Sequence, residues 1–173
     1  MISEIREALK SHRSHRITGH HYSYAGVIVP LFEKDGEVYI LLTRRSDGLR
    51  HHQGEVSFPG GMCEDGDENT MDAAIRECNE EVGVNRDDIE IMGALDDEVT
   101  IAGIVITPYV GVIPYPYNFV LNPKEVAYLI ELPLNHLLKS EDYSSMYFGE
   151  DYIWGLSWGM LSNLKALIRG RRG

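Results

Sequence analysis

The sequence predicts an α/β protein in which a mixed β-sheet lies between helices. Short apolar runs rich in β-branched residues stand before and after a central stretch with helical periodicity, and an amphipathic stretch closes the chain. This order of two strands, a helix, several strands and a helix implies a sheet covered by helices on both faces. The length suits one domain with a sizeable core, so we expect a single domain over residues 1–173.

Apolar runs and turn residues place the individual elements. Asp35-Gly36 is typical of a two-residue hairpin turn. Pro30 and Pro108 lie inside expected strands, and because proline cannot donate a hydrogen bond, they predict edge positions or bulges. The expected elements are an N-terminal helical extension within residues 1–20, strands over 24–32 and 38–43, a central helix that carries 71–82, strands over 89–95, 104–113 and 122–132, a short helix over 133–139, two short strands around 149–151, and a closing helix over 157–169.

The central helix carries the stretch around which the chain is organised. Its carboxylates Glu77, Glu80 and Glu81 fall in one arc at about 100° per residue. Gly83 is placed to end the helix as a C-terminal cap. The apolar residues recur at three- and four-residue steps and share a neighbouring stripe: Met71, Ala74, Ile75, Cys78 and Val82.

Carboxylates packed this closely repel one another, and each like-charge pair costs roughly 0.2–0.5 kcal/mol on an isolated helix. Arg76 lies one turn before Glu80 and can pair with it, but a single arginine cannot neutralise the whole group. Mg²⁺ and Mn²⁺ favour carboxylate oxygens and keep open sites for water and phosphate. The helix therefore predicts a site for Mg²⁺ or Mn²⁺, and the alternative is a solvated acidic face.

A glycine turn and a group of arginines precede this helix. Gly60 and Gly61 follow Phe58-Pro59 and allow the backbone to pass close to a ligand. Arg44, Arg45 and Arg50 belong to the densest local positive charge outside the two termini. Arginine binds phosphate oxygens through its planar fork, so these residues are candidates for substrate binding. The alternative is that Arg44 or Arg45 forms a salt bridge to the acidic loop.

Two adjoining motifs resemble those of a known family. Arg76-Glu77-Cys78-Asn79-Glu80-Glu81-Val82-Gly83-Val84 resembles the REUxEExGU half of the Nudix hydrolase motif. Residues 41–61 resemble LLTxRSxxxRxxxGxxxFPGG, the motif of the coenzyme A pyrophosphatase branch of that superfamily. The loop between the motifs is one residue longer than in the general pattern, so the acid expected to pair with Arg76 is either Asp67 or Glu68.

The resemblance implies a Nudix-type α/β/α sandwich and metal-dependent hydrolysis of the diphosphate bond of coenzyme A or acyl-coenzyme A. The products would be 3′,5′-ADP and (acyl-)4′-phosphopantetheine. It also implies that Glu77, Glu80 and Glu81 bind Mg²⁺ or Mn²⁺ and that Arg76 orients them or pairs with the loop acid. Glu125 is our first candidate for a general base outside the helix and Glu98 the second, with a structural role open for each.

Charge and composition exclude some partners. The net charge of −11 argues against binding to nucleic acid polymers, which needs a basic surface. No apolar run approaches the ~20 residues that span a bilayer, and the N-terminus lacks an apolar signal core. We therefore expect a cytoplasmic protein that acts on a small-molecule substrate, and a homodimer is compatible with the sequence. The basic residues 12–16 are expected to form a solvated tail rather than an anion-facing surface, and residues 96–98 either bind a further cation or face water.

Three other functions compete with this prediction. The nearest is a Nudix enzyme that acts on NADH, ADP-ribose or an oxidised nucleotide, because one scaffold can serve many substrates. The second is a catalytically silent Nudix domain that binds a ligand, although such a domain has no need to keep the repelling carboxylates. The third is an acidic protein-interaction module, which explains the charge but not the glycines and their spacing.

Overall fold

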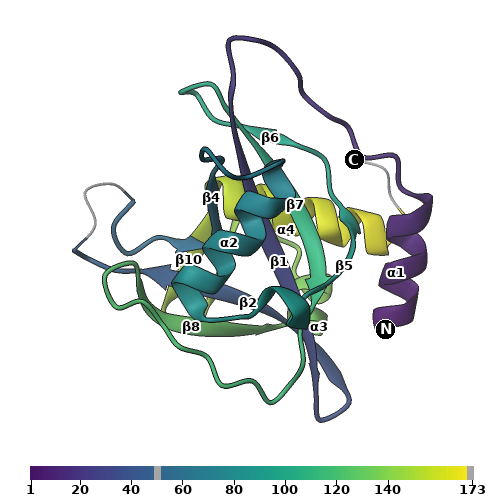
Figure 1. The fold of residues 1–173 in the computed structure, drawn as a ribbon. Coiled ribbons are helices and arrows are strands. Elements are labelled where there is room, and N and C mark those ends of the chain that lie inside the picture. Colours follow the sequence, from purple (N-terminus) through teal and green to yellow (C-terminus); the bar gives the residue numbers. More distant parts are fainter. Residues whose placement is uncertain (49–51, 171–173) are drawn as a thin grey trace.

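The computed structural model describes residues 1–48 and 52–170 and forms a mixed sheet between helices (Figure 1). Its strands are β1 (Ser23–Lys34), β2 (Glu37–Arg45), β3 (Val56–Ser57), β4 (Gly60–Met62), β5 (Glu90–Ala94), β6 (Glu98–Val99), β7 (Ile104–Val112), β8 (Val126–Pro133), β9 (Ser145–Phe148) and β10 (Asp151–Trp154). Its helices are α1 (Ile2–Ser11), α2 (Thr70–Val82), the 3-10 turn η1 (Arg86–Asp88), α3 (Leu134–Lys139) and α4 (Gly155–Ile168). The predicted α/β class is confirmed.

Strand β1 forms the axis of the main sheet. Among the described residues, β1 to β8 belong to that sheet, and β9 and β10 form a separate hairpin. Strand β1 runs parallel to β7, and the other pairings are antiparallel. Near its start β1 pairs with β4, and from Leu31 onward it pairs with β2. Strand β8 pairs with β2 from Tyr39 to Arg45, and β3 pairs with Thr43 and Arg44. Strands β1 and β2 therefore have different neighbours at the end of the sheet that carries the glycine turn.

Both strand prolines lie in the middle of this sheet, so the predicted edge positions or bulges are wrong. Pro30 and Pro108 belong to β1 and β7, which pair with each other in continuous register. On β1, the pairing with β4 ends at Val27 and the pairing with β2 begins at Leu31, which leaves Pro30 between them. Pro108 likewise lies between the residues of β7 that pair with β6 and those that pair with β5. A residue without an N–H group is tolerated where one neighbouring strand gives way to the next.

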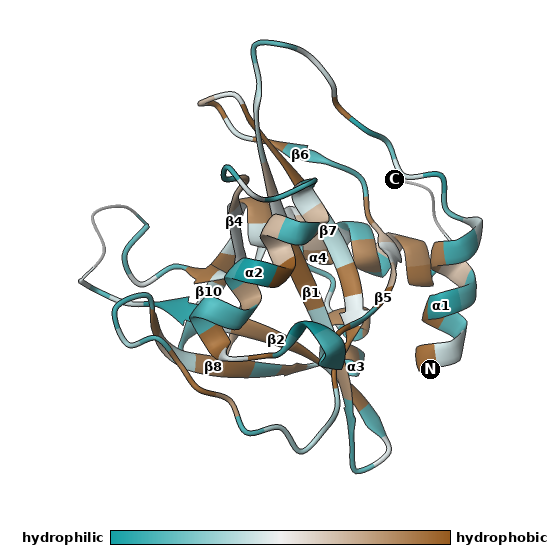
Figure 2. Ribbon diagram, viewed as in Figure 1, coloured by the Kyte–Doolittle hydropathy of each residue, from teal (hydrophilic) through white to brown (hydrophobic). Residues whose placement is uncertain are grey.

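Helices cover the two faces of the sheet and bury two apolar cores (Figure 2). The predicted stripe of α2 packs on one face, with Ala74, Cys78 and Val82 fully buried. Residues of α1, α3 and α4 pack on the opposite face. Gly83 ends α2 in the left-handed region at φ 76°, as predicted. No helix within the described ranges combines the length and the apolar character needed to cross a bilayer.

The segment after α1 is held against the protein, so the prediction of a solvated tail is wrong. The His12 ring lies 3.0 Å from Asp96, and Arg16 donates to Asp97 over 2.6 Å. The side chain of Asp97 is 3% exposed and also accepts hydrogen bonds from the Ile17 amide and from Thr107. Asp96 and Asp97 thus both bind the N-terminal segment, Asp97 as a buried side chain and Asp96 as one that is 40% exposed.

Candidate active site

The glycine turn at β4 is built around a glutamate of α2. A Cβ atom on Gly61 would lie 2.6 Å from both Cδ and Oε1 of Glu77. Gly60 has φ 157°, and a Cβ there would lie 2.3 Å from the carbonyl oxygen of Gly26. Glycine is therefore required at Gly60 by the neighbouring strand, whereas at Gly61 a side chain would displace the Glu77 carboxylate.

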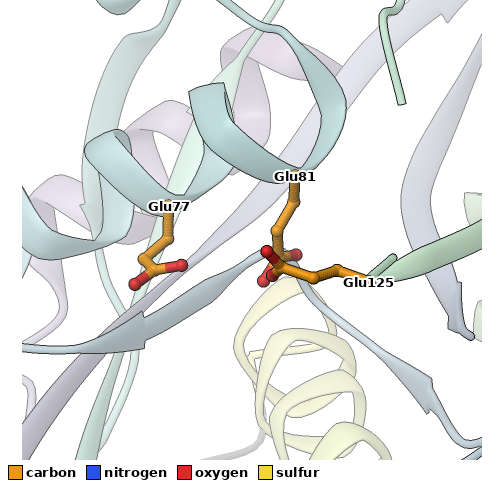
Figure 3. A group of neighbouring side chains, drawn as sticks. All are labelled: Glu77, Glu81 and Glu125. Atoms are coloured by element: carbon orange, nitrogen blue, oxygen red, sulfur yellow. The ribbon is translucent and has the colours of Figure 1, made fainter. Parts of the chain in front are cut away.

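Three carboxylates from two parts of the chain meet beside this turn (Figure 3). Glu77 and Glu81 lie one turn apart on α2, and Glu125 immediately precedes β8. Each contributes an oxygen within 4.8 Å of the others, and we call this group the carboxylate cluster. Glu80 lies outside the cluster: its side chain is 52% exposed and lies 3.4 Å from Arg76.

The cluster is electrostatically unfavourable when it is ionised and unliganded. Burial, reinforced by the charges of Glu125 and Glu77, raises the pKa of Glu81 to about 8. Arg45 and the backbone amide of Gly60 oppose this rise. Burial also raises the pKa of Glu77. Converging, buried carboxylate oxygens are the donors that hard divalent cations prefer, so the residues present fit Mg²⁺ or Mn²⁺.

Arg76 ties the acidic loop to the cluster. Its guanidinium binds both oxygens of Asp67, at 3.1 Å from Nε and 2.9 Å from Nη2, and holds the pKa of Asp67 below its usual range. It also donates to Glu77 over 2.9 Å. The partner left open by the sequence is therefore Asp67, whereas Glu68 contributes a backbone amide to Asp72. Arg76 thereby positions Glu77 from the side of the loop.

The predicted substrate-binding arginines have different surroundings. Arg44 lies 3.5 Å from Asp151, which also accepts a hydrogen bond from the Tyr128 hydroxyl. Arg45 lies close enough to Glu81 to oppose the rise in its pKa, and its buried Nε has no hydrogen-bond partner among the described residues. Arg50 lies outside the described residues. Of the predicted substrate-binding arginines that the structure describes, Arg45 is the one that lies near the cluster.

Glu98, the second candidate for a general base, lies elsewhere. A Cβ on Gly159 would lie 2.7 Å from its Oε1, which places the Glu98 side chain against α4. Helix α4 packs on the face opposite α2, and Glu98 is not part of the carboxylate cluster. Glu125 is thus the candidate outside α2 that the fold brings to the other two glutamates.

Comparison with known proteins defines the class to which this fold and site belong. Residues 23–142 match the family model described as the NUDIX domain. The chain is 30% identical over 158 residues to "Uncharacterized Nudix hydrolase NudL" of Enterobacter sp. (strain 638), covering 83% of this chain and 82% of that protein. The protein of the same name from Yersinia pestis (strain Pestoides F) is 33% identical over 154 residues, covering 81% and 77%. The chain therefore belongs to the Nudix family.

Solved structures share the fold. An Ap4A hydrolase of C. elegans in a binary complex superposes with a TM-score of 0.61 at 19% identity, covering 86% of this chain and 98% of that one. The NUDIX domain of Shewanella oneidensis NrtR, complexed with ADP ribose, gives a TM-score of 0.60 at 18% identity, covering 95% and 96%. The Nudix fold and the prediction of a Nudix hydrolase are confirmed. At the level of the family, the activity is that of a pyrophosphatase on nucleoside diphosphate derivatives, and such enzymes generally use divalent metal ions.

Proposed function

We propose that the protein hydrolyses the diphosphate of coenzyme A or acyl-coenzyme A to 3′,5′-ADP and (acyl-)4′-phosphopantetheine. The observation that carries this proposal is the position of the coenzyme A motif relative to the carboxylate cluster. Arg45 of that motif acts electrostatically on Glu81, and its last glycine, Gly61, packs against Glu77. Two residues of this motif thus adjoin the residues proposed to carry out the chemistry.

Glu77, Glu81 and Glu125 are the proposed ligands for Mg²⁺ or Mn²⁺, and Glu80 stays a prediction as a further ligand. When bound, the cation screens the charge of the diphosphate and lowers the pKa of a coordinated water. Arg76 holds Glu77 in place through a hydrogen bond of 2.9 Å. Arg45 lies close enough to Glu81 to oppose the rise in its pKa, and we assign its guanidinium to a phosphate oxygen of the substrate.

The reaction adds one water across the P–O–P bond, so the attacking water must lose a proton. We assign this proton to the oxygen of Glu125 that does not bind the cation. The Glu125 carboxylate lies within 4.8 Å of the other two glutamates but comes from a different element. A hydrogen bond of 2.9 Å from Asn122 holds it there. The two helix glutamates remain the alternative bases.

The helix glutamates are tested by paired substitutions. Glu81→Gln should lower turnover strongly, because Glu81 is buried inside the cluster. Glu80→Gln should lower turnover if Glu80 turns inward to the cation, and should leave it near the wild-type value if Glu80 only pairs with Arg76. Metal-dependent hydrolysis by Glu81→Gln at the wild-type rate would remove Glu81 from the proposed mechanism.

Recognition of the 3′-phosphate of coenzyme A is assigned to Arg50. Arg50→Ala should weaken hydrolysis of coenzyme A more than that of a dinucleotide without a 3′-phosphate. Arg44 serves as the matched control, because its guanidinium already lies beside Asp151. Equal losses of hydrolysis on both substrates in Arg50→Ala would mean that Arg50 does not bind the 3′-phosphate.

A substrate panel tests the function directly. The purified protein is incubated with Mg²⁺ or Mn²⁺ and coenzyme A, acyl-coenzyme A, NADH, ADP-ribose, diadenosine tetraphosphate or nucleoside triphosphates, and the products are identified by mass. Preferential release of 3′,5′-ADP is the expected result. Faster hydrolysis of another compound would assign a different Nudix substrate, and binding without turnover would indicate a catalytically silent domain.

A further inference from the structure

The loop before β8 is joined to the last turn of α2. The backbone amide of Asn122 donates to the carbonyl oxygen of Glu81 over 2.9 Å, and that of Val120 donates to Val82 over 3.1 Å. Carbonyls in the last turn of a helix have no partner within the helix. Residues 120–122 supply those partners, and they thereby fix the position of Asn122 relative to Glu81.

The side chain of Asn122 is oriented at both of its ends. Its Oδ1 accepts the backbone amide of Lys124 over 3.2 Å, and its Nδ2 donates to Oε1 of Glu125 over 2.9 Å. The Asn122 carbonyl also accepts the amides of Glu125 and Val126, over 3.0 and 2.9 Å. Because Oδ1 faces an N–H donor, the amide must turn its own N–H groups toward the Glu125 carboxylate.

Glu125 needs such a donor. Its carboxylate lies within 4.8 Å of those of Glu77 and Glu81, which repel it. Asn122 supplies a side-chain hydrogen bond of 2.9 Å to this carboxylate. A hydrogen bond to an ionised carboxylate is shorter and stronger than one between neutral groups, so the Asn122 amide can fix the orientation of the Glu125 carboxylate.

We propose that Asn122 is a positioning residue, which links α2 to Glu125 and holds the Glu125 carboxylate in the cluster for cation binding and turnover. This inference rests on the proposed function of the cluster as a divalent cation site. Groups that orient a metal ligand change metal affinity or activity by about 10- to 100-fold when they are removed. The Asn122 backbone contacts persist in Asn122→Ala, so that substitution removes mainly the side-chain hydrogen bonds.

A double-mutant cycle separates positioning from a merely structural role. Mn²⁺ affinity is measured by titration calorimetry, and kcat and KM on the hydrolysed substrate are measured at saturating Mn²⁺, for wild type, Asn122→Ala, Glu125→Gln and the double variant. Asn85→Ala is the matched control, because Asn85 also donates an amide hydrogen bond to a carboxylate, Asp88 over 3.3 Å, outside the cluster. Circular dichroism and thermal melting verify that each variant is folded.

Asn122→Ala should weaken Mn²⁺ binding and lower kcat by about tenfold or more in the wild-type background, and by less than about twofold in the Glu125→Gln background. Equal losses in both backgrounds would overturn the proposal, since Asn122 would then not act through Glu125. If Glu125→Gln binds Mn²⁺ too weakly to measure, the comparison is made with Asn85→Ala. A loss of Mn²⁺ affinity in Asn122→Ala that is no larger than in Asn85→Ala then overturns the proposal. Calorimetry measures the effect of Asn122 on Mn²⁺ affinity even if no compound of the panel is hydrolysed. A failure of the proposed hydrolase function can therefore be distinguished from a failure of the proposed role of Asn122.

Discussion

Replacing Gly61 by alanine tests whether the position of Glu77 matters for activity. The added Cβ would lie 2.6 Å from Cδ and Oε1 of Glu77, and ordinary contact begins at 3.4 Å, so the Glu77 carboxylate must retreat by about 0.8 Å (3.4 − 2.6). The obstacle is a side chain rather than the backbone, and the protein should still fold. A displacement of about 1 Å at a catalytic constellation costs roughly 100-fold in rate. We therefore expect Gly61→Ala to lower kcat/KM by about 100-fold while the melting temperature changes little.

The assay compares Gly61→Ala with Gly48→Ala. A Cβ on Gly48 would meet its nearest neighbour, Oγ of Ser46, at 3.6 Å, which is an ordinary contact, so this variant should keep wild-type kcat/KM. Mn²⁺ affinity measured in parallel shows whether the loss arises at the cation site. A kcat/KM for Gly61→Ala within about twofold of wild type, in a folded protein, would refute the reasoning that Glu77 must stay in the cluster.

Three further predictions concern stability. With a chelator present, the free energy of unfolding should fall from about pH 4.5 to about pH 8: the pKa of Glu81 is raised to about 8, so the folded state keeps a proton that the unfolded chain releases. Urea titrations at a series of pH values should show a smaller fall in the free energy of unfolding for Glu81→Gln, and millimolar Mg²⁺ should reverse the fall at pH 8. A free energy of unfolding that does not change with pH in the wild-type protein would contradict this. Asp97→Asn should lower the free energy of unfolding by about 1–3 kcal/mol through loss of hydrogen bonds and leave kcat/KM unchanged. Glu90→Gln, the control, should change the free energy of unfolding very little, because the Glu90 side chain is 63% exposed in its pair with Arg6. Gly26→Ala should lower the melting temperature clearly, because its Cβ would lie 1.8 Å from the Thr70 carbonyl oxygen and push α2 off β1; a wild-type melting temperature would mean that α2 can shift freely.

Local features of the fold could be predicted from the sequence. The stripe of α2 and its end at Gly83 follow from helical geometry, and the Asp35-Gly36 turn follows from its two residues, which adopt φ 53° and 80°. The strand prolines could not be placed in the same way. Whether Pro30 costs a hydrogen bond depends on where β4 ends and β2 begins along β1, which is a property of the assembled sheet.

The candidate site could likewise be predicted from the sequence only where it depends on local geometry. Glu77 and Glu81 are one helical turn apart, so their convergence is visible in the sequence. The sequence predicts Glu125 only as a general base outside the helix, and its approach to the helix glutamates accompanies the hydrogen bond from the Asn122 backbone amide to the end of α2. Glu80 shares the helical arc, but its side chain lies 3.4 Å from Arg76 and is 52% exposed, which spacing alone does not reveal.

The most direct test is a crystal structure with millimolar Mn²⁺ and anomalous scattering data. A peak between the carboxylates of Glu77, Glu81 and Glu125, bonded to at least two of them, is the result that the proposed chemistry predicts. Full density for these side chains without any anomalous peak among them, at a cation concentration that supports hydrolysis, would contradict it.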